Sequence, residues 1–178
     1  DFKMKRTLLI LLIAFTFSSC DSLTELLEFN VDNDLTENIT VSVLQTQGAA
    51  RDFSLSETTD LNSGELAQYR DKVTAVKINK FTYKIKDFVG NDAGELVAGS
   101  LKFNDIIITS LADFNISNAA SAGTIFEITD ANVLSSVENA FLNNNSATLS
   151  LVGSVLSDAG SMDFTVEVFM NMTATIKD

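Results

Sequence analysis

The residue with the most distinctive chemistry in this sequence is Cys20, the only cysteine among 178 residues. It ends a segment that begins with two cations, Lys5 and Arg6, and continues as an apolar run, Leu8–Phe17. A run of about ten residues fits the roughly 7–15 of a secretory signal and falls short of the roughly 20 that span a bilayer. The segment therefore predicts export, with Met4 as the initiator.

Two small residues, Ser18 and Ser19, stand directly before Cys20. With the cationic start and the apolar run, they resemble the lipobox that ends a bacterial lipoprotein signal peptide, although Phe17 stands where leucine is commoner. The resemblance covers residues 5–20 and implies cleavage before Cys20, a diacylglycerol on its sulfur and an acylated amine. Two or three acyl chains anchor a protein stably, whereas one does so marginally. The alternatives are a plain signal peptide with an incidental cysteine and an uncleaved anchor helix.

The resemblance divides the chain into a removed signal peptide (1–19), a lipidated tether (20–28) and one β-sandwich domain (29–178). Cleavage removes three of the 12 cations and one of the 24 anions, which leaves a net charge of −14. This charge disfavours nucleic acid and anionic lipid surfaces as partners, because phosphate binding needs a basic surface. In the tether, Ser22 stands between an aspartate and a leucine, a pattern that resembles the O-glycosylation site of Bacteroidota.

Composition removes most catalytic chemistries from these residues. The sequence has no histidine, and lipidation of Cys20 leaves no free thiol. This excludes a Ser-His-Asp triad, histidine or thiolate metal centres and a cysteine nucleophile. Carboxylates alone run many glycosidases, but the acids here are scattered, with no distinguished pair. We therefore expect no enzymatic activity and no cofactor, with a carboxylate-only enzyme as the alternative.

One acidic stretch has the spacing of a metal loop. Residues 30–34 (NVDND) place oxygen ligands at positions 1, 3 and 5 of a calcium-binding loop. Position 6 is then Leu35 rather than glycine, and position 12 is Val41 rather than glutamate, so the EF-hand pattern fails. We expect no metal site, with a looser calcium site that includes Glu37 as the alternative.

Six of the nine cations left after cleavage lie between positions 70 and 86. If Phe81, Tyr83 and Ile85 point into the core, alternation along a strand puts the neighbouring lysines on the outer face. Two interpretations are open: a solvated face whose lysines protect a strand edge against aggregation, or a docking surface for an acidic partner protein or an anionic glycan. The candidate binding residues are Lys77, Lys80, Lys84 and Lys86.

Alternating apolar and polar residues, rich in Val, Ile, Thr and Phe, predict strands along most of the chain. The clearest is the last, Asp163–Lys177, which we expect to be central in its sheet and paired with the strand Ala147–Leu156. Short connections favour antiparallel pairing. The predicted fold is all-β: an antiparallel β-sandwich, jelly-roll-like or Ig-like, with two short helices, at Asp60–Asp71 and Asp130–Leu142, and a small-residue loop at 118–123.

Two predicted strands, 76–88 and 96–103, change the parity of their apolar residues partway. Because a strand side chain changes face with each residue, one extra residue is needed to keep both halves inward. The change falls near Asn79 and Lys80 in the first strand, and at Gly99 and Ser100 in the second. Matching changes in consecutive strands predict a bent hairpin.

An anchor without catalytic chemistry predicts a non-enzymatic accessory or structural lipoprotein of the bacterial cell envelope. We expect it on the outer membrane, at the periplasmic face or the cell surface, bound to a membrane protein complex. The acidic, Asn/Ser/Thr-rich composition resembles that of small Bacteroidota lipoproteins. The alternative is a carbohydrate- or small-ligand-binding surface lipoprotein that uses exposed rings, with Tyr69, Tyr83, Phe88 and Phe169 as candidates.

Overall fold

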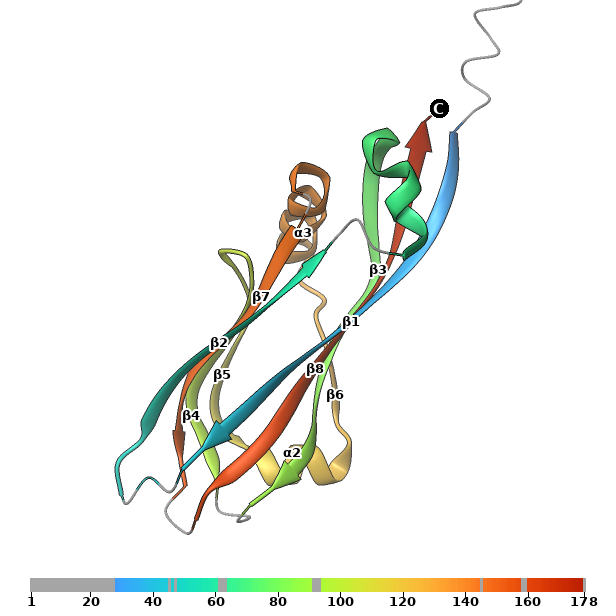
Figure 1. Cartoon of the computed structure of the whole chain (residues 1–178). Coiled ribbons are helices and arrows are strands. Elements are labelled where there is room, and N and C mark those ends of the chain that lie inside the picture. The colour runs from blue at the N-terminus through green and yellow to red at the C-terminus, as the bar shows by residue number, and fades with distance from the viewer. Residues whose placement is uncertain are drawn as a thin grey trace, which may run out of the picture.

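The chain folds into two four-stranded antiparallel sheets that pack face to face (Figure 1). The structure, a computed structural model, describes residues 28–44, 46, 48–60, 64–90, 94–144, 146–157 and 160–177. The strands are β1 (Glu28–Val43), β2 (Arg51–Asp60), β3 (Val73–Val89), β4 (Glu95–Phe103), β5 (Ile106–Asn115), β6 (Ile125–Glu127), β7 (Ser146–Leu156) and β8 (Met162–Lys177). The helices are η2 (Gly64–Lys72), α2 (Ile116–Ala122) and α3 (Ala131–Asn143).

The strand order identifies the sandwich as a jelly roll. Sheet A has the order β1-β8-β3-β6, and sheet B has the order β2-β7-β4-β5. Every connection between consecutive strands crosses from one sheet to the other, except the β4–β5 hairpin. Eight strands wound in this way form the double Greek key of a jelly roll. The predicted antiparallel β-sandwich is confirmed, and its jelly-roll version describes the topology.

The last strand, β8, supplies many of the buried core side chains, and its alternation predicted which of its residues point inward. Its even-numbered side chains from Met162 to Ile176 are all buried, and β8 is an interior strand of sheet A. The predicted partner was wrong: β8 pairs with β1 and β3, and β7 lies in the other sheet. The β7–β8 connection crosses the end of the sandwich, so these two strands face each other across the core.

The parity change in β3 is a β-bulge, as predicted. The pairing with β8 shifts between Ile78 and Lys80, which leaves Asn79 as the extra residue. Val76 and Phe81, on either side of it, are both buried. The bulge therefore keeps both halves of a 17-residue strand inward.

The second parity change was placed wrongly, and so was the hairpin. In β4 the pairing with β7 shifts between Leu96 and Ala98, so the extra residue is Val97 and does not lie at Gly99 and Ser100. Gly99 stands at an inward position opposite Gly153, and a glycine pair gives no apolar signal that marks the inner face. β3 and β4 lie in different sheets and do not form a hairpin.

Both predicted helices exist, and one more was missed. Asp130 caps α3, because its carboxylate accepts the N–H groups of Asn132 and Val133. The first helix is the 3-10 helix η2, which begins at Gly64 because β2 continues to Asp60. The small-residue loop predicted at 118–123 was wrong: these residues lie largely in α2.

Capping explains how such small residues form α2. The side chain of Asn115 accepts the Asn118 N–H at 2.7 Å, and Gly123 ends the helix in the left-handed conformation with φ of 59°. Asparagine before a helix and glycine after it are common caps. Among the described residues, no helix has the length and apolar content needed to cross a membrane.

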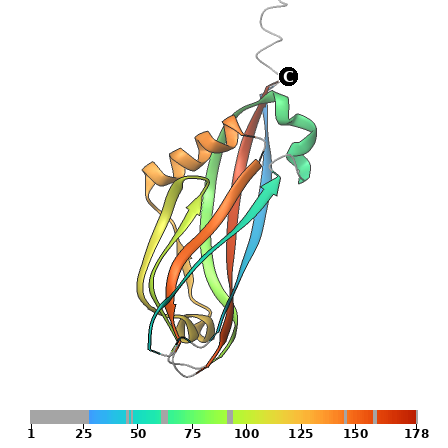
Figure 2. The ribbon, with the colours of Figure 1, turned by 60° about the vertical axis from the view of Figure 1, so that its left-hand side comes forward.

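Helices η2 and α3 lie together at the end of the sandwich where β1 begins and β8 ends (Figures 1 and 2). The Arg70 guanidinium in η2 donates to the carbonyl of Phe141 at 2.6 Å and also to that of Asn144. A cation at these last carbonyls of α3 satisfies groups that have no hydrogen-bond donor within the helix. The two helices thereby cover one end of the sandwich as a unit.

Helix α3 also covers an edge of β3. Strand β6 pairs with β3 only over Thr82–Lys84, so the rest of that edge needs other partners. The Glu138 carboxylate accepts the Ile78 N–H at 2.8 Å, and the Ile128 N–H donates to the Phe81 carbonyl at 2.9 Å. A covered edge is protected from pairing with another chain.

Replacing Glu138 with alanine is expected to destabilise the fold by about 1.5–3 kcal/mol, because the bond from Ile78 is made to a charged acceptor. Urea unfolding measures the loss, and amide hydrogen exchange at Ile78 should accelerate with it. Glu138→Gln keeps a hydrogen-bond acceptor, so its free energy of unfolding should decrease clearly less than that of the alanine variant. Equal losses in the two variants would contradict this role for the carboxylate.

Candidate functional site

The four candidate lysines lie on the outer face of sheet A, as the alternation predicted for Lys80, Lys84 and Lys86. Their register partners on β8 stand at outward positions, between the buried even-numbered residues. Strands β1, β8 and β3 lie side by side in this face (Figure 1). The register aligns five rows across it: Asp32–Thr173–Lys77, Asp34–Asn171–Lys80, Thr36–Phe169–Thr82, Asn38–Glu167–Lys84 and Thr40–Thr165–Lys86.

Two of the lysines are engaged inside the molecule. Glu167 on β8 forms ion pairs of 2.7 Å with both Lys84 and Lys86. The hydrogen bond from Lys84, followed by that from Lys86, holds the pKa of Glu167 below its ordinary value, and the bond to Glu167 raises the pKa of Lys86. Lys77 and Lys80 are exposed and form no ion pair with any residue that the structure describes. The lysine surface therefore has two halves. In the closed half, Lys84 and Lys86 are paired with Glu167; in the open half, Lys77 and Lys80 have no ion pair with a described residue.

The Lys84–Glu167–Lys86 cluster predicts a small, pH-dependent contribution to stability. The lowered pKa means that the contribution is present above the ordinary value of 4.5 and is lost as the pH falls through the folded-state pKa. Glu167→Gln is expected to destabilise the protein at pH 7 by less than about 1 kcal/mol, as for other surface ion pairs. Thermal unfolding at pH 7 and at pH 3 measures this, and the difference should shrink at the lower pH. The exposed Glu57→Gln serves as control, and a difference that does not change with pH would contradict the ion pairs.

Polar side chains of β1 and β8 form a hydrogen-bonded ladder beside the open half. Asn171 Nδ2 donates to Asp34 at 2.7 Å, and Thr173 Oγ1 donates to Asp32 at 2.6 Å. The bulge residue Asn79 donates to Asn171 at 3.0 Å and to Thr173 at 2.8 Å. The ladder holds two carboxylates at the β1 margin of the face, opposite the lysines at the β3 margin.

These carboxylates do not form the calcium site considered from the sequence. Asp32 and Asp34 stand on the outer face, whereas Glu37 occupies an inward position between the buried Leu35 and Ile39. Side chains on opposite faces of a strand do not converge on one ion. In the ranges that the structure covers, no group of three or more acidic, cysteine or histidine side chains is arranged to hold a metal.

Three of the four rings proposed for ligand binding are occupied with internal packing. Tyr83 is buried and stacks on Phe126 at a centroid distance of 4.8 Å, and its burial raises the pKa of its hydroxyl. Tyr69 packs edge-to-face on Phe29 at 5.2 Å, and Phe88 packs against the core. Phe169 alone of the four stands on the outer face of a sheet.

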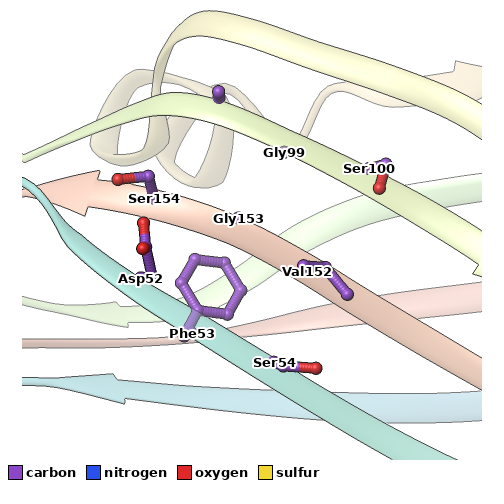
Figure 3. A pocket seen from close by; sticks show the side chains of 9 residues that line it. Asp52, Phe53, Ser54, Gly99, Ser100, Val152, Gly153 and Ser154 are labelled. Carbon is purple, nitrogen blue, oxygen red and sulfur yellow. The ribbon is translucent and has the colours of Figure 1, made fainter.

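A hollow on the surface of sheet B was not predicted. It measures about 660 Å³, and Figure 3 shows its lining. Gly99 and Gly153 are register partners in its middle row. A Cβ on Gly153 would lie 2.7 Å from the Ala98 carbonyl and 2.9 Å from the ring of Phe53, so only glycine fits. Glycines inside two strands are the sequence signal that could have located it. Its lining residues are Asp52, Phe53, Ser54, Ala98, Gly99, Ser100, Val152, Gly153 and Ser154.

The hollow has little chemistry of its own. Among its lining residues, Asp52 is the one with an ionisable side chain, and the others are small, hydroxylic or apolar. The two remaining candidate residues, Cys20 for lipidation and Ser22 for O-glycosylation, lie outside the residues that the structure describes.

Comparisons with known proteins add only a likeness of fold. No family model matches the chain, and no curated protein matches it. Among solved structures, the decameric BFDV capsid protein is 5% identical, with a TM-score of 0.43, over 82% of this chain and 99% of that chain. The mud crab tombus-like virus structure is 10% identical, with a TM-score of 0.38, over 85% of this chain and 82% of that chain. This similarity concerns the arrangement of strands and carries no inference about function.

Proposed function

We propose that the chain is a lipid-anchored, non-enzymatic subunit of an outer-membrane or cell-surface complex in a bacterial envelope. The observation that carries the proposal is the spacing between Cys20 and the fold: β1 begins at Glu28, only eight residues after the cysteine of the lipobox-like segment. A domain that starts so soon after an acylated cysteine is held close to the membrane.

The geometry of the sandwich supports an anchored role. Glu28, the first residue of β1, is the register partner of Lys177 near the C-terminus, and the two side chains form an ion pair of 3.6 Å. Eight residue steps reach at most about 28 Å, so this end lies near the bilayer in the proposed protein. The sheets extend roughly 50 Å from it, at about 3.3 Å per residue along β8. The end that carries α2 then points away from the lipid, and the outer faces of the sheets point sideways, along the membrane (Figure 2).

The chemistry of the chain favours presentation of a surface over catalysis. The 178 residues contain no histidine, and acylation would occupy the one cysteine. The strong negative charge keeps the domain soluble and away from anionic headgroups. The outer face of sheet A, with charges of both signs in fixed positions, is the surface best suited to contact another protein.

Purification of a C-terminally tagged chain from native membranes in mild detergent, followed by mass spectrometry, tests the proposal. We expect a membrane protein to co-elute in near-equal amount and to be lost from a Cys20→Ser control. A protein that elutes with no other protein would contradict the subunit role. A hydrolase activity that disappears on replacement of one carboxylate would contradict the non-enzymatic role.

A further inference from the structure

The outer face of sheet A is charged in opposite senses at its two margins. Asp32 and Asp34 lie at the β1 margin, and Lys77 and Lys80 lie in the same two rows at the β3 margin. All four are exposed, and β8 separates the margins with uncharged residues in these rows. In each of these two rows, a carboxylate at one margin therefore stands opposite a lysine at the other margin.

We propose that this face binds a second copy of the chain about a two-fold axis parallel to β8. Such a rotation exchanges the two margins and preserves the position along the strands. Asp34 then lies over Lys80 of the second copy, and Asp32 lies over Lys77. Because the contact is isologous, each pair occurs twice. Face-to-face packing of sheets with their strands nearly aligned is a common arrangement.

The side chains on the axis fit this contact. Phe169, half-buried at the centre of β8, meets the same residue of the second copy. In its row, Thr36 meets Thr82 of the second copy, so the row of the rings contains no charge. Two aromatic rings surrounded by polar pairs form the kind of centre that dominates protein interfaces.

The half of the face that carries Glu167 adds little attraction. Lys84 and Lys86 already pair with Glu167 and meet the uncharged Asn38 and Thr40 of the second copy, and Glu167 lies on the axis opposite Glu167 of the second copy, where its two lysines offset its charge. The attraction therefore comes from the rows of Asp32 and Asp34, which lie toward the beginning of β1.

A second copy suits this face better than a partner of a single charge. An acidic protein would be attracted by the lysine margin and repelled by Asp32 and Asp34, and a basic protein would meet the reverse. Two chains of net charge −12 repel over most of their surfaces. In the five rows, however, four lysines stand against three carboxylates, Asp32, Asp34 and Glu167, so this face has no net negative charge.

The direction of the axis also agrees with anchoring. Two copies related by an axis along β8 have parallel strands, so β1 begins at the same end in both. Both acyl anchors then reach one membrane. In this respect alone the inference rests on the proposed function, since the contact itself needs no lipid.

The contact is small, and we expect weak association in solution. Five rows across three strands cover roughly 14 Å by 27 Å, which is on the order of 400 Å² per copy. Stable interfaces bury about 1,200–2,000 Å² in total. Confinement to one membrane raises the effective concentration of the two copies and compensates for this small area.

Sedimentation equilibrium of residues 20–178 with Cys20→Ser tests the contact, because this chain contains the whole sandwich and no lipid. Between about 10 µM and 1 mM, the range suited to a weak interface, we expect a monomer–dimer equilibrium. Lys80→Asp and Asp34→Lys should each weaken the dimer by roughly tenfold or more, because each places like charges opposite one another twice. The double variant, and an equimolar mixture of the two single variants, should recover to within about threefold of the parent.

This set of variants separates the proposed contact from an effect of net charge. Lys80→Asp makes the chain more acidic and Asp34→Lys makes it less acidic, so net charge alone would weaken one dimer and strengthen the other. A monomer at every concentration, a tighter dimer for Asp34→Lys, or a mixture that does not associate would each overturn the proposal. Thermal unfolding of each variant shows that it folds.

A crosslink on the axis gives a second readout. In the Cys20→Ser chain, Phe169→Cys should oxidise rapidly to a disulfide-linked dimer, because the new thiol meets its own copy. Thr36→Cys, in the same row but off the axis, should crosslink much more slowly. Equal rates would contradict the axis. Failure of these tests leaves membrane anchoring intact, and loss of anchoring leaves the soluble dimer measurable.

Discussion

Replacement of Cys20 by alanine is expected to abolish incorporation of fatty acid into the protein. In the proposed lipoprotein the sulfur and the amine of Cys20 carry all the acyl chains, and alanine offers no sulfur to alkylate. Each buried CH₂ contributes about 0.8 kcal/mol to membrane binding, so two or three chains hold the domain almost irreversibly. Without them, a processed chain has only a strongly acidic domain, which anionic headgroups repel.

The effect is measured by metabolic labelling with an alkyne-bearing palmitate and by phase partition in detergent. The wild type should carry the label and enter the detergent phase, and Cys20→Ala should do neither once its leader is removed. Ser22→Ala is the matched control: it removes the candidate glycosylation hydroxyl two residues away and should keep the label. Label on the alanine variant would show that acylation occurs elsewhere and would contradict the anchor.

The largest loss of stability is expected from Phe103→Ala. Phe103 is fully buried in β4, and its ring packs on that of Phe141 in α3 at a centroid distance of 5.0 Å. Truncation of a buried phenylalanine costs about 3–5 kcal/mol, from the lost apolar contact and the cavity that remains. A domain of this size is stable by only about 5–15 kcal/mol, so the variant loses a large fraction of its stability.

In thermal unfolding this loss corresponds to a decrease of roughly 10 °C in Tm. Ile107→Ala provides the control from the same β4–β5 hairpin, because Ile107 is 53% exposed. The free energy of unfolding of Ile107→Ala should stay within about 0.5 kcal/mol of the wild-type value. A loss for Phe103→Ala no larger than that of Ile107→Ala would show that the packing of α3 on sheet B does not support the fold as described.

The elements that the sequence predicted well are those whose faces are marked by apolar residues. Alternation over the length of β8 indicated its inner face, and the parity change near Asn79 and Lys80 located the bulge in β3. The same alternation placed the candidate lysines on one face. Apolar parity reports which side chains point inward, because burial is what it records.

Strand partners could not be predicted in the same way. Parity does not record which strand lies beside which, so the sequence did not indicate that β8 pairs with β1 and β3. The ion pairs of Glu167 depend on that register and were missed for the same reason. Helix α2 was missed because seven mostly small residues carry no helical period; its signals were the caps, Asn115 and Gly123. The hollow on sheet B arises from glycines in two strands that are distant in sequence, and only the fold brings them together.

The outcome for the lysine surface combines both interpretations that the sequence left open. Lys84 and Lys86 are partly exposed and paired with Glu167, as in a solvated face held by local ion pairs. Lys77 and Lys80 stand opposite the carboxylates of Asp32 and Asp34, which a solvated face does not require. The proposed self-association uses only this second pair of lysines.

The most direct test of the central claim, a lipid-anchored subunit, is the intact mass of the wild-type protein purified from native membranes. The account predicts a chain that begins at Cys20, with the added mass of a diacylglyceryl group and an amide-linked acyl chain at that residue. A chain that begins at another residue, or one that begins at Cys20 with a free thiol, would contradict it.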